Sequence, residues 1–252
     1  MVRKMSLHFL SLSLLFFASG CSSLYEWFRA DPAPQTPFLD GSGMLVDQSP
    51  EFPFRRIWID SDTDLKKYDK IIVAPVSTNN LIKSSGWEKV QGRTVVGDLR
   101  EDSTEIAIYM HSSFQNALYN DPKRRFIVAD KPGLGTLRLD LALVQLVPSK
   151  ADLNVVEGVV GIVVWPVGFL TVFNSGSTAF EGILRDSVTG KTVCSFVDRE
   201  MDEPAVVNLP GFTYYGNARY FIDRWSRQFV DFMNAEDYSK LKTDFPLKLI
   251  VW

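Results

Sequence analysis

The alternation of apolar and polar residues predicts most of the regular elements of this chain. The run Lys70–Val76 is continuously apolar and rich in β-branched side chains, which is typical of a buried strand. Thr136–Val147 carries apolar residues at alternate positions and predicts a half-buried strand. Ala179–Ser187 and Thr192–Asp198 flank a short turn in which Gly190 supplies a positive φ, so they predict a hairpin.

Two segments have the apolar spacing of amphipathic helices. The first opens with the capping box Asp102-Ser103-Thr104-Glu105 and ends at Asp121-Pro122, and the second spans Asn217–Asp237. Their expected core faces consist of Ile106, Met110, Phe114, Ala117 and Leu118 in the first, and of Ala218, Phe221, Ile222, Trp225, Phe229, Phe232 and Met233 in the second.

These elements predict an α+β fold. We expect a mostly antiparallel sheet packed by two amphipathic helices, with a hydrophobic insert between sheet strands. Arg125–Ala129 is expected to form a further short strand, and the C-terminal Leu247–Trp252 an edge strand. Folded structure should start near Arg56, so that residues 56–252 form a single α+β domain.

The hydrophobic insert, Val155–Phe173, has Glu157 as its only charge. Its strongly apolar part, Gly158–Phe173, is about 24 Å long as a helix and contains helix breakers, whereas a span needs about 20 residues. A membrane span is therefore disfavoured. Two interpretations of the insert stay open: a buried hairpin or helix pair that completes the core, and a loop that contacts the membrane or a partner. The candidate contact residues are Val164, Trp165, Phe169 and Leu170.

The N-terminus has the pattern of an export signal. Arg3 and Lys4 precede the apolar stretch Leu7–Phe17, and small residues lead to Cys21. The last part resembles the lipobox of bacterial lipoproteins, with Ala18 where Leu or Val is usual. The resemblance implies a signal peptide over residues 1–20, lipidation of Cys21 with acyl chains such as palmitate, and a flexible linker over residues 21–55.

Charge and composition limit the partners. Loss of two of the 27 basic residues with the signal leaves 25 against 30 acidic residues, which argues against nucleic acid and against electrostatic adhesion to anionic lipid. The expected partners are the membrane, through the N-terminal lipid, and another envelope protein. In the lipoprotein resemblance, Ser22 is compatible with the outer membrane of a Gram-negative bacterium, with the domain facing the periplasm.

Cysteine and histidine are too scarce for several kinds of chemistry. Beyond Cys21, the mature chain would hold only Cys194 and His111, which excludes a disulfide framework and a zinc cage of four cysteines, or of two cysteines and two histidines, within one chain. Cys194 lies in an apolar strand and is expected to be an inert core thiol rather than the nucleophile of a Cys–His pair. No cofactor and no metal are predicted.

Carboxylates offer the remaining candidate chemistry. Asp198, Glu200, Asp202 and Glu203 form an acidic cluster that we interpret as a solvated strand end. A hydrolase that uses Asp198 and Glu200 stays open as an alternative. Thr189-Gly190-Lys191-Thr192 has the core of a phosphate-binding loop but lacks the glycine five residues before Gly190, where Arg185 stands.

Three stretches carry a resemblance to a known family. They are Pro37-Phe38-Leu39-Asp40, Tyr68–Val76 and Phe180–Lys191, the last with the pattern Glu-Gly-x-x-x-Asp-x-x-Thr-Gly. They resemble an uncharacterised family of bacterial lipoproteins, catalogued as domain of unknown function 3313, over most of residues 35–240. The family implies no activity. From the residues themselves, we expect Glu181 and Asp186 to pair with Arg185 or Arg199 across the hairpin.

The expected function is that of a lipid-anchored cell-envelope protein with a binding or structural domain and no catalytic activity. Two alternatives stay open. One is the carboxylate-dependent envelope hydrolase, and the other is an auxiliary lipoprotein of a transporter, a specialised form of the first expectation. A pair of buried carboxylates in a cleft would favour the hydrolase.

Overall fold

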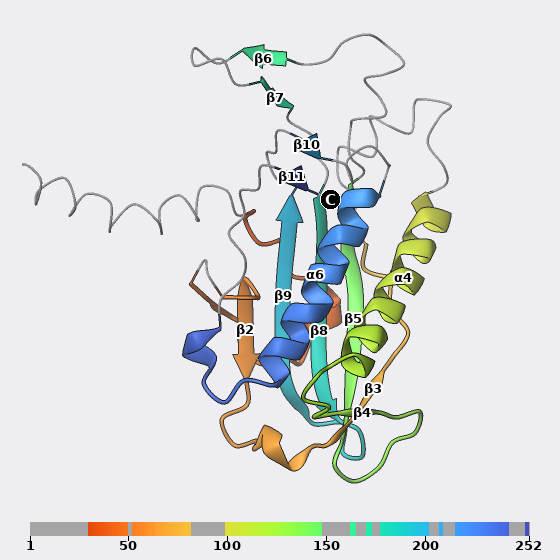
Figure 1. Ribbon diagram of the computed structural model, residues 1–252. Coiled ribbons are helices and arrows are strands. Elements are labelled where there is room, and N and C mark those ends of the chain that lie inside the picture. Colours follow the sequence, from red (N-terminus) through yellow and green to blue (C-terminus); the bar gives the residue numbers. More distant parts are fainter. Residues whose placement is uncertain are drawn as a thin grey trace, which may run out of the picture.

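A computed structural model describes residues 30–49, 52–81, 99–147, 162–164, 170–172, 177–201, 207–208, 215–241 and 250–251. Within these residues, two helices cover one face of a seven-stranded sheet (Figure 1). In sheet order the strands are β1 (Val46–Asp47), β2 (Arg56–Ile59), β9 (Thr192–Met201), β8 (Ser177–Asp186), β5 (Thr136–Val147), β3 (Lys70–Val73) and β4 (Ile127–Val128). The fold is thus α+β, as predicted.

The sheet is mixed, which corrects the expectation of a mostly antiparallel one. β3 runs parallel to both of its neighbours, β4 and β5, while the other neighbouring pairs are antiparallel. The chain leaves β3 and passes through helix α4 (Leu99–Tyr119) before it enters β4. A crossover of this length returns the chain in the same direction, which a tight turn cannot do.

Smaller elements complete the described part of the chain. Three short 3-10 helices in this part of the chain are η1 (Pro37–Leu39), η2 (Leu65–Lys67) and η4 (Tyr238–Lys240). β6 (Ile162–Val164) pairs with β7 (Leu170–Val172), and β10 (Val207–Asn208) pairs with β11 (Ile250–Val251), each as a separate two-stranded sheet. β11 therefore does not extend the main sheet as an edge strand.

The two helices confirm the predicted core faces but differ from prediction at one end each. α4 contains Leu99, so the expected capping box at Asp102 lies inside its first turns. α6 (Gly216–Met233) ends four residues before Asp237. The apolar positions predicted for α6 are all buried, and so are those predicted for α4 except the half-buried Ala117. No described helix is long and apolar enough to cross a membrane.

β5 has the predicted bounds, and its alternating pattern breaks at one place. Leu137, Leu139, Leu141 and Leu143 are buried in the core beneath the helices. The pairing of β5 with β8 shifts register between Leu143 and Gln145. Because of this irregularity, Leu146 rather than Gln145 returns to the core, while Val144 stays on the opposite face in a small apolar cluster with Ala142 and Ala179.

Aromatic rings fill the space between the helices and the sheet. The Phe54 and Phe196 ring centroids are 4.6 Å apart, and Phe180 and Trp225 are equally close. The Phe196 ring lies against the backbone of Gly182 on β8, where an added Cβ would be 2.5 Å from ring atom Cζ. Only glycine leaves room for this ring, which explains one residue of the Glu-Gly motif.

Residues 30–45, which we call the strap, lie across the opposite face of the sheet (Figure 1, red to orange). Leu39 is buried against Ile183 and Val197, and Phe38 packs against the same cluster. The sequence pattern predicts a flexible linker here, but Phe38 and Leu39 pack against the sheet. Met44, in contrast, is exposed.

Candidate functional site

The start of the strap and the strand ends that precede and follow the insert lie at one end of the sheet, which we call the anchor end (Figure 1, top). The insert leaves β5 after Val147 and returns to β8 at Ser177, and these two residues are paired. Arg199, which donates from Nη1 to the Asp31 carbonyl oxygen at 3.3 Å, is paired with Ala179, two residues along β8 from Ser177. Two strand residues span about 6.6 Å, so the start of the strap lies beside the base of the insert.

The candidate contact residues fall only partly within the described chain. Val164 on β6 pairs with Leu170 on β7, so the described backbone of the insert is an antiparallel hairpin. Trp165, Phe169 and the expected lipidation site Cys21 lie outside the described residues. Their roles stay predictions.

A buried carboxylate holds the strap on the sheet. Thr36 donates its backbone N–H to Glu181 Oε1 at 2.8 Å and its hydroxyl to Glu181 Oε2 at 2.6 Å. Glu181 is 2% exposed, and this burial raises the pKa of its carboxyl above the ordinary value, although the two bonds from Thr36 act in the opposite direction. The expected pairing of Glu181 with Arg185 or Arg199 is wrong, because its partner comes from a segment 145 residues earlier.

Asp186 organises the hairpin turn instead of pairing with an arginine. Its Oδ1 accepts from the backbone N–H groups of Val188 and Thr189 and from the Thr189 hydroxyl, and its Oδ2 accepts from the Tyr68 hydroxyl at 2.9 Å. The Thr189 N–H contributes most to lowering the pKa of this carboxyl. Gly190 completes the turn at φ +72°. Every specified position of the Glu-Gly-x-x-x-Asp-x-x-Thr-Gly pattern therefore has an architectural role.

Cys194 and His111 are not brought together. Cys194 is fully buried on β9, and desolvation raises the pKa of its thiol. His111 lies on α4, where its Nε2 donates to the Val73 carbonyl oxygen at 3.1 Å. The histidine thus satisfies a strand carbonyl of β3, and the thiol belongs to the core, as predicted for Cys194.

The interpretation of the acidic cluster as a solvated strand end is wrong for its two described members. Asp198 and Glu200 both project from β9 toward α6 and are buried. Asp198 accepts from the Trp225 indole N–H at 2.9 Å and from the Arg55 backbone N–H at 3.2 Å, while Glu200 forms an ion pair with Arg224. These internal partners favour a structural role for the pair. Asp202 and Glu203 lie outside the described residues.

The described carboxylates, cysteine and histidine do not form a cluster of three or more that could hold a metal ion. The described residues also place neither Asp198 nor Glu200 in the wall of the cavities between α4 and α6 or around the strap. Among the described residues, the best-formed hollow is lined instead by helix surface side chains.

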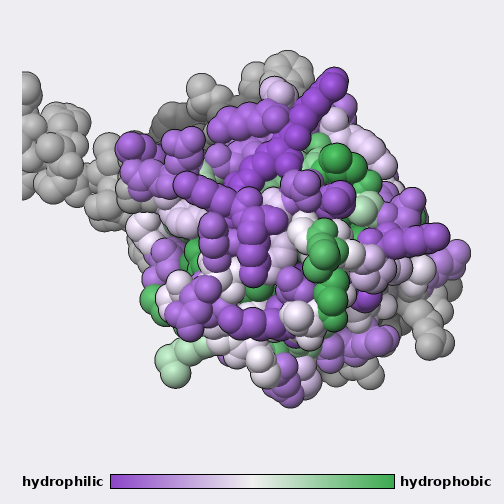
Figure 2. All heavy atoms as spheres, turned by 90° about the horizontal axis from the view of Figure 1, so that it is seen from below, coloured by the Kyte–Doolittle hydropathy of each residue, from purple (hydrophilic) through white to green (hydrophobic). Residues whose placement is uncertain are grey.

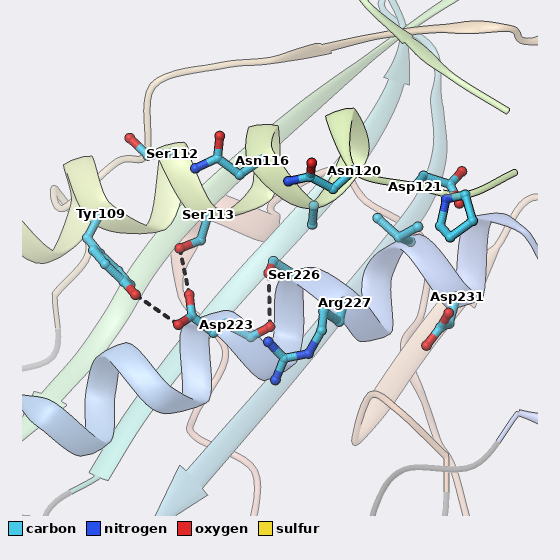
Figure 3. A pocket seen from close by; sticks show the side chains of 13 residues that line it. Tyr109, Ser112, Ser113, Asn116, Asn120, Asp121, Asp223, Ser226, Arg227 and Asp231 are labelled. Atoms are coloured by element: carbon cyan, nitrogen blue, oxygen red, sulfur yellow. Dashed lines mark hydrogen bonds between the residues drawn. The ribbon is translucent and has the colours of Figure 1, made fainter. Parts of the chain in front are cut away.

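α4 and α6 run in parallel and are joined by polar contacts at both ends. At their N-terminal ends the Tyr215 hydroxyl donates to Asp102, and in their middle parts Tyr109 and Ser113 both donate to Asp223. Beyond their C-termini Asn234 donates to Asp121. Between these contacts the helices present small side chains, and a groove of about 530 Å³ opens along the seam (Figure 3).

Sequence reasoning missed this groove. Its walls are two rows of polar side chains at four-residue spacing, which an amphipathic pattern assigns simply to the solvent face. The rows are visible in the sequence, but their juxtaposition depends on the parallel packing of helices that are separated by about 100 residues. The members of the two rows are Ser112 and Asn116 on α4 with Asn120 directly after its last residue, and Asp223, Arg227 and Asp231 on α6.

Comparisons with known proteins identify a family. None of the curated proteins matches the sequence. Two of the similar solved structures are PelC dodecamers from Paraburkholderia phytofirmans, and both have a TM-score of 0.34. The first, a single-residue variant, is 10% identical, and the match covers 72% of this chain and 98% of the PelC chain. The second is 11% identical, and the match covers 68% of this chain and 95% of the PelC chain. The sequence model of a family of proteins of unknown function, DUF3313, matches residues 34–229. This chain therefore belongs to the DUF3313 family.

Proposed function

We propose that the protein is a lipid-anchored component of the cell envelope whose anchor end faces the membrane and whose domain binds or supports another envelope component without catalysis. The observation that carries this proposal is that the start of the strap lies at the same end of the sheet as Val147 and Ser177, the strand residues that precede and follow the insert. Acyl chains on Cys21 would supply the anchor, and an outer-membrane location facing the periplasm follows from the sequence pattern around that cysteine.

Chain length limits how far the lipid lies from the folded domain. Ala30 is buried, so the folded part is held from that residue onward. Nine residues separate Cys21 from Ala30, and an extended chain of nine residues reaches about 30 Å at most. Several buried acyl chains, at about 0.8 kcal/mol per CH₂, are enough for stable attachment. The anchor end would then lie close to the bilayer.

The strap fixes this orientation. Thr36 is held by Glu181 near the middle of the sheet, and Asp31 is held by Arg199 nearer the anchor end. The strap therefore points its N-terminus toward the insert. Any pull from the membrane acts through these contacts, which makes the strap the mechanical link between lipid and domain.

The insert supplies an apolar surface at the same end. Its sequence from Gly158 to Phe173 carries no charge. We propose that Val164, Trp165, Phe169 and Leu170 contact the membrane or an envelope partner held there. The surface of the opposite end is largely hydrophilic with small scattered apolar patches (Figure 2), and such scatter needs no partner.

Site-specific photocrosslinking in the native envelope tests the proposal. A photoreactive amino acid placed at position 165 or 169 of the full chain is expected to yield adducts with phospholipid or with one defined envelope protein. Leu134 and Val188 are matched control positions, because both are exposed and lie on neighbouring loops at the opposite end of the sheet. Equal adduct patterns at all four positions would overturn the proposed orientation.

Metabolic labelling with a palmitate analogue tests the anchor separately. The chain is expected to be labelled and to sediment with membranes, and Cys21→Ser should abolish both properties while leaving the fold intact. Continued labelling of the Cys21→Ser chain would contradict the proposed anchor. An auxiliary lipoprotein of a transporter is a special case of this proposal, in which the crosslinked partner is a transporter subunit.

A further inference from the structure

The groove between α4 and α6 has the geometry of a site for a linear ligand. Its two walls are the polar rows already described, and the small or apolar side chains of Ser113, Ala117, Ser226 and Val230 lie between them. Within each row the members are four residues apart, which is about 6 Å along a helix. Because the helices are parallel, the two rows advance in the same direction (Figure 3).

This repeat matches an extended peptide. In an extended chain, every second side chain points to the same side, and residues i and i+2 are about 6.6–6.8 Å apart. Asn116 on α4 and Asn120, whose backbone N–H donates to the Asn116 carbonyl just past the helix end, are one helical turn apart and could therefore each meet an equivalent backbone amide. A carboxamide offers both a donor and an acceptor, so it can satisfy the N–H and the C=O of one peptide unit.

The side chains that would make these contacts form no hydrogen bonds with other residues in the described part of the protein. Neither Asn116 nor Asn120 makes a side-chain hydrogen bond to another described residue, and the same holds for Arg227 and Asp231. Asp223, by comparison, accepts hydrogen bonds from Tyr109 and Ser113 and is already engaged. The groove thus presents two amides, one cation and one carboxylate to an incoming ligand.

The charges select the ligand further. Arg227 and Asp231 are one helical turn apart on α6, so an acidic and a basic side chain two positions apart in an extended peptide would face them in register. Asp231 is partly desolvated and lies near Asp121, and both effects raise the pKa of its carboxyl. Lys123 and Arg227 lower that pKa, and a further cation in the groove would relieve the same repulsion.

We infer that the groove binds an extended peptide segment of another protein, in which an acidic and a basic residue stand two positions apart. The backbone would lie along Asn116 and Asn120, with the acidic side chain at Arg227 and the basic one at Asp231. This inference goes beyond the lipid anchor and the anchor end, because the groove lies along the helix face and needs neither the lipid nor the insert.

Fluorescence anisotropy with the full lipidated chain in detergent micelles tests it. The probe is a fluorescein-labelled nonapeptide of alternating Thr and Ser that carries Glu and Lys two positions apart. It is expected to bind, and a peptide with Glu and Lys three positions apart should bind at least fivefold more weakly, because one charge then points away. Absence of binding, or equal binding of the two peptides, would overturn the inference.

Variants assign the binding to the groove. Replacing Asn116 and Asn120 together by Ala should raise Kd at least tenfold, whereas Asn79→Ala, at an exposed position outside the groove, should leave it unchanged. Arg227→Glu should reverse the preference, so that a peptide with Lys at both charged positions binds better than the Glu and Lys peptide. Asp130→Glu is a conservative control at an exposed carboxylate outside the groove.

Two results would contradict the peptide assignment even if the groove binds something. If the Arg227→Glu chain keeps the original charge preference, the register with Arg227 and Asp231 is wrong. If a chito-oligosaccharide, and no peptide, produces nuclear magnetic resonance shifts at Asn116 and Asn120, the groove is a glycan site. Circular dichroism of each variant separates these outcomes from loss of fold.

Discussion

Thr36 and Glu181 are 145 residues apart in sequence, yet both oxygens of the Glu181 carboxylate accept hydrogen bonds from Thr36. One bond comes from the backbone and the other from the side chain, so the position of the strap is fixed in two directions. The site is buried, which makes each bond sensitive to replacement, because a buried acceptor without a partner retains its full desolvation cost.

Thr36→Val should therefore destabilise the domain. The change keeps the shape of the side chain but removes the hydroxyl that donates to Glu181 Oε2, at an expected cost of about 1–3 kcal/mol in the free energy of unfolding. Thr36→Ser is the matched control, because it keeps the hydroxyl. Urea denaturation measures the cost, and hydrogen exchange over residues 30–45 should rise in the valine variant alone. Unchanged exchange there would show that the hydroxyl bond does not hold the strap.

The pH dependence of stability should carry the signature of Glu181. Burial raises the pKa of this carboxyl, so the folded chain keeps its proton over a range in which the unfolded chain, with a pKa near 4.5, has released it. The proton-bound form therefore contributes stability that is complete below about pH 4.5 and is lost as the pH rises through the folded-state pKa.

Glu181→Gln isolates this contribution because glutamine does not titrate. The free energy of unfolding of the unmodified chain minus that of Glu181→Gln should fall as the pH rises above about 4.5, and it should level off above the folded-state pKa. Urea titrations of both chains at a series of pH values measure the difference. A difference that is constant, or that grows with pH, would contradict the desolvated state assigned to Glu181.

Gly182 and Gly190 should respond differently to alanine. At Gly182 the new methyl would meet the buried Phe196 ring, so Gly182→Ala is expected to cost about 1–3 kcal/mol through overpacking. At Gly190 there is open space but a φ of +72°, so Gly190→Ala should cost about 1 kcal/mol from backbone strain alone.

A second change tells the two mechanisms apart. Phe196→Leu replaces the ring that lies against Gly182 with a shorter side chain. Part of the unfolding free energy lost in Gly182→Ala should therefore be recovered in the Phe196→Leu background. The cost of Gly190→Ala should be the same in both backgrounds, since Gly190 has no neighbour within 4 Å of an added Cβ. Chemical denaturation of the three single and two double variants checks this. Additive behaviour at Gly182 would refute the clash.

The spacing of apolar residues was sufficient to predict a helix or strand and its buried face, because these depend on the residues of that element alone. β5 has the predicted bounds because the alternation of apolar residues from Leu137 to Leu143 is typical of a strand and of no other element. The α6 core face was predicted because its apolar residues recur at helical spacing. The bulge at Val144 could not be predicted, since it is a relation between β5 and the register of β8.

The features that could not be predicted from the sequence depend on contacts between residues that are far apart in the chain. Asp198 and Glu200 flank the charged Arg199 on β9, and this local run of charges does not show which face lies under α6. The partner of Glu181 lies in a segment that composition marks as a linker. The groove needs two helices side by side in parallel. In each case the decisive neighbour is more than 20 residues away in the sequence, beyond the reach of a periodic pattern.

The buried ion pair between Glu200 and Arg224 should behave as a unit. Arg224→Met removes the cation that compensates Glu200, whose side chain is 11% exposed, so the variant is expected to lose about 3–5 kcal/mol of unfolding free energy. Adding Glu200→Met to Arg224→Met should recover most of that loss, because a matched apolar pair has no charge to desolvate. A double variant no more stable than Arg224→Met would show that the charge of Glu200 is not the source of the cost.

The thiol of Cys194 provides the last prediction. It is the only cysteine of the chain besides Cys21, and burial raises its pKa, so the native protein should hold almost no thiolate at this position. Iodoacetamide, which reacts with thiolate, is therefore expected to leave Cys194 unmodified at pH 8 and to modify it fully in 6 M guanidinium chloride. Intact-mass spectrometry counts the modification. Cys194→Ala gives the baseline, because it removes the reactive atom altogether. Rapid modification of the folded chain would contradict the core position of this thiol, and it would restore the case for a nucleophile that the distance of His111 from β9 otherwise argues against.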